Sequence, residues 1–302
     1  MAISRNQLVK ELEPGLNALF GLEYKQYENQ TADIYTTESS DRAFEEEVML
    51  SGFAQAQVKP EGSGVTYDNA QETFTARYTN ETIALAFAIT EEAIEDNLYD
   101  RLASRYTKAL ARSMASTKNV KGASTLNNGN PGGTFTSGDG VTLFNTAHPT
   151  IAGTFSNTLA TASDLNETSL EQALIDINAF TDERGLKIAA KGVKMIIPSA
   201  LQFVAERLMK SQGRTSTADN DINAVRSMGM IPQGYRVNNY LTDADAFFIL
   251  TDVPNGMKHF NRAPLTTKME GDFDTGNVRY KARERYVFGV SDPRGIFSSP
   301  GA

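Results

Sequence analysis

Cysteine is absent from the 302-residue chain, and histidine occurs only twice. Without cysteine the chain has no disulfide, no cysteine-ligated zinc site and no cysteine nucleophile. No segment approaches the roughly 20 consecutive apolar residues of a membrane-spanning helix. Residues 1–16 lack the apolar run of a signal peptide. The sequence also has no GxGxxG after a predicted strand and no GK[ST] phosphate loop, which removes two common nucleotide-binding signatures.

The two histidines do not form a recognisable metal or catalytic pattern. There is no HExxH spacing, and the sequence points to no Asp or Glu partner for either of them. His148 precedes Pro149 in an expected loop, where we expect it to cap the backbone. His259 has no neighbouring motif. Neither histidine is therefore predicted to be a ligand or a catalytic base.

Two further patterns imitate functional motifs. Asp219, Asp221 and Asn223 imitate the start of a calcium loop, but Ala224 and Met230 stand where such a loop needs glycine and glutamate. The segment 274–276 spells the Asp-Thr-Gly of aspartic proteases, but one copy in a turn-prone stretch indicates a turn. The sequence thus predicts no catalytic residue, no cofactor-binding residue and no metal site.

Charge is unevenly distributed along the chain. The 37 acidic and 29 basic residues give a net charge of −8, which opposes bulk binding to nucleic acid or an anionic membrane. Residues 1–50 carry ten acidic and four basic residues, whereas residues 98–121 carry one acidic and six basic ones. The basic segment favours either nucleic-acid binding or a solvated or subunit-facing surface. We expect its arginines, such as Arg105 and Arg112, to pair with the arm carboxylates at 45–47.

The first 82 residues predict segments that cannot pack alone. In residues 1–50, Pro14 and Gly15 interrupt leucines at helical spacing, which indicates an arm with short helices. Residues 51–82 have a turn signal at 60–64 and apolar–polar alternation, so they predict a two-stranded ribbon. The ribbon is too polar to bury a face of its own, and isolated ribbons are marginal in water. It must therefore lie on another surface.

A strand and a long helix follow. Residues 83–89, IALAFAI, predict a buried strand, and Thr90 opens a helix whose start carries Glu91, Glu92 and Glu95, where the helix dipole favours negative charge. Residues 98–121 contain neither glycine nor proline and predict the longest helix. Its expected apolar stripe consists of Leu98, Leu102, Tyr106, Ala109, Leu110 and Met114.

The Gly- and Asn-rich residues 127–150 mark an internal boundary, after which helices and strands alternate. Thr168 and Glu171 predict a capping box for a helix that ends at Gly185. Residues 193–197 and 247–250 predict buried strands, and a helix starts at Pro198 and stops near Gly213. Residues 211–223 predict a polar, solvent-facing loop. The chain closes with a long strand on which Arg279, Lys281, Arg283 and Arg285 recur at period two, so one face is charged.

An unpacked arm, an unpacked ribbon and no convergent polar site favour an assembly protein. Four stretches carry a resemblance to the major head (capsid) subunit of tailed bacteriophages, specifically the Mu-like group. They are EGSGVTYDNAQETFTARYTNETIALAFAITEEAIEDNLYD, DGVTLFNTAHPT, VKMIIPSALQFVAERL and RYKARERYVFGVSDPRGIFSSPG, of which the first is the most specific and the third is generic alone.

The resemblance implies an α+β fold, the tailed-phage major capsid fold. Its expected parts are an N-terminal arm (1–50), an extended loop (51–82), a peripheral domain with a long spine helix (83–130 and 266–302) and an axial domain (131–265). The implied function is structural. Hexamers and pentamers would build an icosahedral head around double-stranded DNA, assembled in the bacterial cytoplasm and located in the virion.

The resemblance also implies partners. Many relatives carry a long scaffolding segment before the arm. Because the arm here begins at residue 1, a separate scaffolding protein is expected, together with a portal and a decoration protein. Some relatives cross-link a loop lysine to an asparagine; Lys59 lies near the loop tip, but no asparagine partner is evident. An encapsulin-type shell around cargo and, further removed, a hydrolase remain as alternatives.

Overall fold

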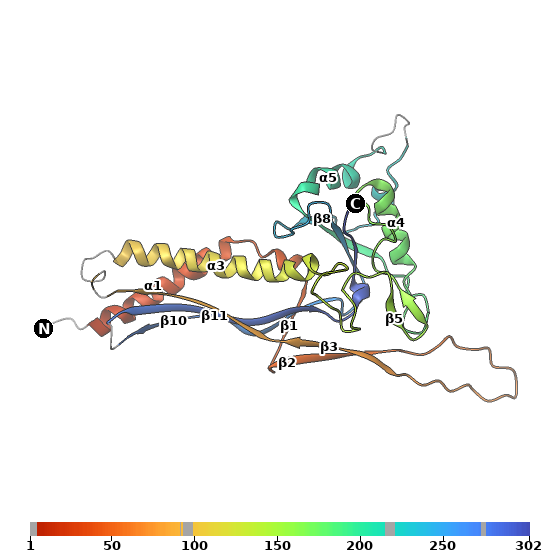
Figure 1. Ribbon diagram of the computed structural model, residues 1–302, viewed down its shortest axis with the longest axis horizontal. Helices are drawn as coiled ribbons and strands as arrows, with labels where there is room; N and C mark the ends of the chain where they lie inside the picture. Colours follow the sequence, from red (N-terminus) through yellow and green to blue (C-terminus); the bar gives the residue numbers. More distant parts are fainter. Residues whose placement is uncertain (1–4, 91, 93–98, 215–220, 273–275) are drawn as a thin grey trace.

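The structure is a computed structural model that describes residues 5–90, 92, 99–214, 221–272 and 276–302. Its longest elements form a four-stranded sheet with two helices on one face (Figure 1). The strand order is β1 (Thr36–Ser39), β10 (Met257–Gly271), β11 (Val278–Val290) and β4 (Glu81–Ile89). The helices are α1 (Arg5–Gln26) and α3 (Tyr99–Asn127). We call this part the long sheet.

Alternation along β11 builds the long sheet. Val278, Tyr280 and Ala282 are buried beneath the helices, while the residues between them are exposed. Strands alternate sides at every residue, so one strand can face both a core and water. Leu16 of α1 and Met114 of α3 pack into the same core. The predicted long strand with one charged face is confirmed.

Helix α1 corrects the expectation of short, interrupted helices. It runs 22 residues with Pro14 inside it. Pro14 and Gly15 are exposed, whereas Leu16 and Phe20 are buried against α3 and the sheet. A proline removes one backbone hydrogen bond, but here the burial of the inner face outweighs that local cost. The length of α1 is therefore set by its tertiary packing and not by the local sequence pattern.

The strand predicted as buried at 83–89 is mostly exposed. It lies within β4, an edge strand that pairs only with β11 in the described part of the chain, and Leu85 is 46 % exposed. The predicted helix start is outside the described residues at Glu91 and Glu95. Helix α3 extends to Asn127, six residues past the predicted end.

The apolar stripe predicted for α3 is only partly correct. Leu110 and Met114 are buried, but Tyr106 and Ala109 are exposed. The buried face is rotated toward Ala103 and Thr107, because small residues allow the helix to approach the sheet closely. The side chains of Leu98 and Leu102 lie outside the described part.

The second unit is a mixed four-stranded sheet flanked by helices (Figure 1). Its strand order is β12 (Ile296–Ser299), β9 (Phe247–Thr251), β7 (Gly192–Ile197) and β8 (Tyr235–Val237). The helical segments are α4 (Glu167–Asn178), η2 (Ser199–Leu201), α5 (Gln202–Lys210) and α6 (Ala224–Met228). Both predicted buried strands, at 193–197 and 247–250, are confirmed. We call this part the short sheet unit.

The ends of α4 differ from the prediction. Its capping box is formed by Asn166 and Ser169, not by Thr168 and Glu171. The helix stops at Asn178 rather than at Gly185, because the next residues turn so that Phe180 enters the core. Gly185 has φ +84° in the following turn, which is why the sequence marks a stop there.

Strand pairing crosses the predicted bounds of the peripheral and axial domains. β12, from the C-terminal segment, joins the short sheet rather than the long one, and β10 begins at Met257. η1 (Gln30–Asp33) and β1 also bring arm residues into contact with α3 and the sheet. Two small hairpins complete the fold, β2 (Phe44–Leu50) with β3 (Glu72–Thr79), and β5 (His148–Thr150) with β6 (Gly153–Phe155). The last turn, η3 (Pro293–Gly295), leads into β12.

Candidate functional site

The ribbon is the most exposed part of the chain. β2 and β3 pair from Phe44 to Leu50, and the pairing closes where the Ser51 amide donates to the Gln71 carbonyl at 2.8 Å. Residues 52–70 form no helix or strand and extend away from both sheets (Figure 1). Large apolar side chains are uncovered there, including Val58 at 93 % and Tyr67 at 90 % exposure. The predicted ribbon is therefore only partly correct: its second strand is β3, but the partner strand β2 lies before residue 51, and residues 52–70 form no strand.

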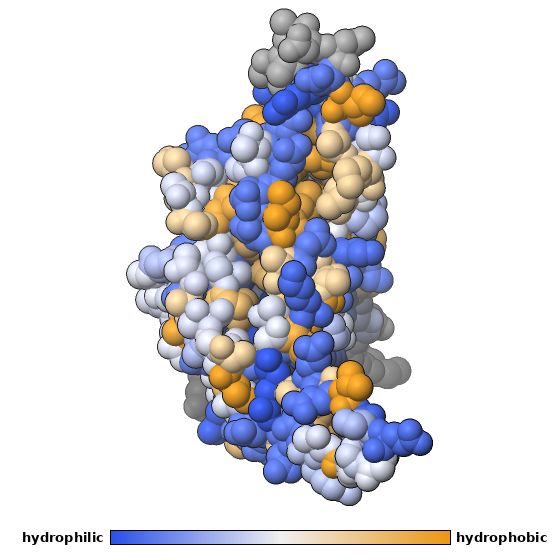
Figure 2. All heavy atoms as spheres, turned by 90° about the vertical axis from the view of Figure 1, so that its right-hand side faces the viewer, coloured by the Kyte–Doolittle hydropathy of each residue, from blue (hydrophilic) through white to orange (hydrophobic). Residues whose placement is uncertain are grey.

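The ribbon end and the short sheet unit show no single large apolar patch. Figure 2, which faces this end, shows separate hydrophobic side chains among hydrophilic ones. The ribbon's charges are mostly negative, since residues 44–79 hold six carboxylates and two cations. A surface that is acidic with scattered apolar groups suits a partner that is basic and partly apolar.

A basic surface lies on the face of the long sheet opposite α1 and α3. We call it the basic face, and it consists of Lys268, Arg279, Lys281, Arg283 and Arg285. Antiparallel pairing places Lys281 between Lys268 of β10 and Ala86 of β4, and Arg283 between Thr266 and Ala84. Lys268 pairs with Glu270 and Arg279 with Asp272, whereas Lys281 and Arg283 have no ion-pair partner among the described residues. Like charges side by side on a sheet are destabilising, so a covering anion would stabilise this face.

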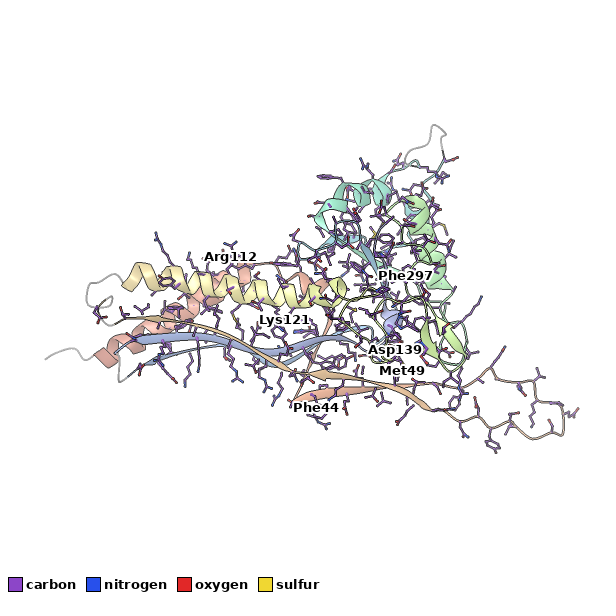
Figure 3. The ribbon with its side chains drawn as sticks, viewed as in Figure 1. Phe44, Met49, Arg112, Lys121, Asp139 and Phe297 are labelled. Carbon is purple, nitrogen blue, oxygen red and sulfur yellow. The ribbon has the colours of Figure 1, made fainter. Side chains whose placement is uncertain are left out.

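His148 is a buried structural residue, and it contacts the backbone as predicted, with its Nε2 3.2 Å from the Leu143 carbonyl oxygen. It begins β5, is fully buried, and its Nδ1 lies 2.6 Å from Asp139 Oδ2. Its Nε2 lies 3.1 Å from Asn157 Oδ1, and its ring stacks on Phe155. Figure 3 shows Asp139 close to the base of the ribbon, and its side chain is buried against the histidine. The carboxylate partner that sequence reasoning missed is nine residues away, but no motif marks it.

His259 is also a core residue. It lies on β10, its Nδ1 is 3.1 Å from Thr37 Oγ1, and its ring stacks on Phe288. Burial, with a smaller contribution from the Lys118 cation, lowers the pKa of His259 to about 4. Nearby, burial raises the pKa of Glu284 although Lys118 lies 3.6 Å away and opposes the shift.

The motifs that imitate known sites do not assemble into one. No group of three His, Cys, Asp or Glu side chains in the described part of the chain is arranged to hold a metal. Asp221 is exposed, and Asp219 lies outside the described residues. Of the Asp-Thr-Gly triplet only Gly276 is described, and it lies in a turn where its amide donates to the Asp272 carbonyl. No described helix is long and apolar enough to cross a membrane.

Comparison with known proteins decides the family. The family model for phage capsid protein matches residues 72–299, three quarters of the chain. The chain belongs to the phage capsid protein family. No curated protein matches it at a significant level.

Solved capsids share the fold of this capsid protein at low sequence identity. The capsid of Myoviridae phage XM1 matches with a TM-score of 0.55 and 11 % identity over 89 % of each chain. A virus-like particle from Pyrococcus furiosus matches with a TM-score of 0.54 and 11 % identity over 94 % of this chain and 97 % of that one. The capsid of an empty GTA particle matches at 0.53, with 15 % identity over 89 % and 88 %. The fold is therefore the tailed-phage capsid fold, as predicted.

The family assigns the function at a general level. This capsid protein is a structural component of a phage shell, located in the virion, and not an enzyme. As a shell protein it associates with further copies of itself.

The spine helix α3 of the capsid protein uses its cations differently from what we predicted. Among the described side chains, one carboxylate of α1 reaches it, with Glu23 Oε1 lying 2.7 Å from Lys108 Nζ. Lys121 instead pairs with Glu81 of β4. Figure 3 places Arg112 on the side of α3 that faces away from the sheet and Lys121 on the opposite side.

The three carboxylates at 45–47 bind elsewhere in the same chain. Glu45 accepts from Ser40 Oγ at 2.7 Å, Glu46 lies 3.7 Å from Arg77, and Glu47 pairs with Lys258 of β10. β2 places these residues in the ribbon, which the predicted boundary at 50 had separated from the arm. The expected pairing of this trio with α3 is thus not seen within the chain.

Proposed function

We propose that the chain is the major head subunit of a tailed phage of the Mu-like group, and that its copies form the hexamers and pentamers of an icosahedral head around double-stranded DNA. The observation that carries the proposal is that one chain presents two uncovered surfaces of opposite charge, the ribbon and the basic face. In a protein that stays monomeric, both surfaces would remain uncovered. Membership of the Mu-like group is supported by the four sequence stretches, of which residues 61–100 are the most specific.

The two surfaces suggest how neighbouring subunits meet. The ribbon carries a net charge of −4, and the basic face has five cations of which two have carboxylate partners. The chain's own ribbon packs on the long sheet only at its base, through Tyr78 and Ala76 against Phe260. The remaining ribbon points away from the basic face of the same chain (Figure 1). A neighbour's ribbon can supply the missing negative charge.

We further propose a domain division close to the predicted one. It has an arm (1–50), an extended loop (51–82), a peripheral domain (83–130 and 266–302) and an axial domain (131–265). Strand pairing supports moving residues 44–50 into the extended loop and residues 296–299 into the axial domain. The polar loop around 211–223 would then face solvent near the capsomer centre, in agreement with the exposed Asp221 and Ile222.

Assembly of such a head would involve a scaffolding protein, a portal and a decoration protein in addition to the subunit itself. Each subunit contact can be modest, because a closed shell engages many contacts at once. We expect DNA to be contacted only weakly, since the chain is acidic overall.

In the encapsulin-type alternative, the chain has the same fold but its shell encloses protein cargo instead of DNA. It is favoured by one observation, the likeness to the virus-like particle from Pyrococcus furiosus, which carries fold information only. Particles purified from cells that hold protein cargo and no DNA would support this alternative.

The decisive experiment is expression of the chain with and without a co-expressed scaffold, followed by size-exclusion chromatography and negative-stain electron microscopy. Closed shells or capsomers are the expected result. Finding only monomers under both conditions would overturn the proposal.

A further inference from the structure

A single buried lysine joins three segments that are far apart in the sequence. Lys258 of β10 has a side chain that is 5 % exposed. Its Nζ lies 3.1 Å from Glu38 Oε1 of β1 and donates to Glu47 Oε1 of β2. Burial lowers the pKa of Lys258, but the hydrogen bonds to Glu47 and Glu38 outweigh it, so the net shift is upward. The ammonium therefore stays charged between an arm strand and a ribbon strand.

The contact continues to the second strand of the ribbon. The other oxygen of Glu47 accepts from Ser291 Oγ, and this hydroxyl is also hydrogen-bonded to the Tyr78 hydroxyl of β3. The Tyr78 ring packs on Phe260 with centroids 4.9 Å apart and lies directly over Gly289. Both ribbon strands are thus fixed to the end of the long sheet. We call Lys258, Glu38, Glu47, Ser291 and Tyr78 the Lys258 cluster.

We propose that the Lys258 cluster is a conformational latch that makes the arm strand β1 and the base of the ribbon dock and release together. Two carboxylates share one ammonium, so each segment depends on the cation that holds the other. Without the cation, Glu38 and Glu47, whose side chains are 42 % and 28 % exposed, would lose their shared partner and repel each other. The proposal rests on contacts within one chain and stands whether or not the proposed shell forms.

Thiol labelling tests the latch, because the natural chain has no cysteine. Ala76→Cys reports the ribbon base and Ile34→Cys reports the arm next to β1; both positions are buried. Each is combined with Lys258→Met in the full chain, and the rate of reaction with a thiol reagent is measured under native conditions. The matched control is Lys210→Met, which makes the same change at an exposed ion pair with Glu206 on α5, outside the basic face.

Lys258→Met should raise the labelling rate at both reporters by roughly tenfold or more, because local opening exposes a buried thiol, while Lys210→Met should leave both rates unchanged. Adding Glu47→Gln to Lys258→Met should lower both rates again by relieving the repulsion, including the rate at position 34, which Glu47 does not touch. If Lys258→Met acted only by leaving a cavity, adding Glu47→Gln would not lower the labelling rates. If Lys258→Met yields no folded protein, Lys258→Gln is measured in the same way. A rise at only one reporter, or no recovery with Glu47→Gln, would overturn the latch.

Discussion

Single residues in this capsid protein act mainly through packing, and the two histidines show this most clearly. Both looked isolated in the sequence, yet both are buried in aromatic surroundings, His148 against Phe155 and His259 against Phe288. The Nε2 atom of His259 is buried without a hydrogen-bond partner in the described part of the chain. A neutral imidazole tolerates this position, but a protonated one would bring an uncompensated charge into the core.

We therefore expect His259 to make the protein less stable in acid. The unfolded chain binds a proton at this residue below about pH 6.5, whereas the folded chain does so only below about pH 4. The free energy of unfolding should fall as the pH decreases between these values, with a slope of at most about 1.4 kcal/mol per pH unit from this residue. Below pH 4 the contribution stops changing.

Denaturant unfolding of the wild type and of His259→Gln at several pH values between 4 and 7 measures this effect. All other titrating groups are shared, so the difference between the two profiles isolates His259. The free energy of unfolding of the wild type, relative to that of His259→Gln, should decrease as the pH falls. Parallel profiles would show that this histidine does not carry the acid sensitivity.

Gly289 is the second residue with a specific packing role. A Cβ atom at this position would collide with the Tyr78 ring at the base of the ribbon. Gly289→Ala should destabilise the fold by about 1–3 kcal/mol, as overpacking does in other cores. The control is Gly271→Ala at the end of β10, where no atom lies within 4 Å of the new Cβ. Equal unfolding midpoints for the two variants would contradict the predicted role of Gly289.

At the scale of elements, the basic face makes the most direct prediction about assembly. Lys281→Glu combined with Arg283→Glu changes two exposed cations that lack ion-pair partners among the described residues. The fold should be retained, because exposed charges contribute little to stability. Shell yield should fall several-fold if a neighbour's acidic ribbon lies on this face. Centrifugation and electron microscopy of expressed particles measure the yield.

A matched control makes the same charge change on the short sheet unit, with Lys187→Glu and Lys191→Glu. Both lysines are exposed. The reverse change in the ribbon, Glu61→Lys with Glu72→Lys, should restore part of the yield in the basic-face variant. If the basic-face and control variants lose yield equally, net charge rather than a specific contact is responsible.

Elements whose signal is local could be predicted from the sequence, and elements defined by distant partners could not. The period-two cations of β11, the glycine-free residues 98–121 that form most of α3, and the apolar runs of β7 and β9 are all patterns within one segment. Helix α1 continues through Pro14 only because its other face is buried. The exposure of β4 follows from its place at the edge of the sheet, which no pattern within IALAFAI reveals.

The candidate surfaces divide in the same way. The exposed ribbon and the basic face were visible as composition and alternation. The contact of Lys258 with Glu47 was not, because the two residues are 211 positions apart in the sequence. The carboxylates at 45–47 were expected to pair with the basic segment 98–121, but Glu47 pairs with the buried Lys258 and Glu46 lies near Arg77.

At the scale of the whole molecule, the acidic balance conflicts with a role in holding DNA tightly. The net charge of −8 repels phosphates at long range, even though the basic face has five cations. Those cations would be neutralised by a neighbour's ribbon in an assembled shell. A shell wall that binds its contents weakly would let packaged DNA slide past it.

We therefore expect the purified chain to show no submicromolar affinity for double-stranded DNA at physiological salt, measured by gel shift. Affinity that comes from phosphate contacts falls steeply as salt rises, so weak binding at low salt should disappear well before 200 mM. If binding is seen at low salt, Lys281→Glu with Arg283→Glu should remove it in unassembled protein, where the basic face is open, but change little in assembled shells, where the ribbon covers it. Submicromolar binding by assembled shells at physiological salt would contradict both the weak contact with DNA and the placement of the ribbon on the basic face.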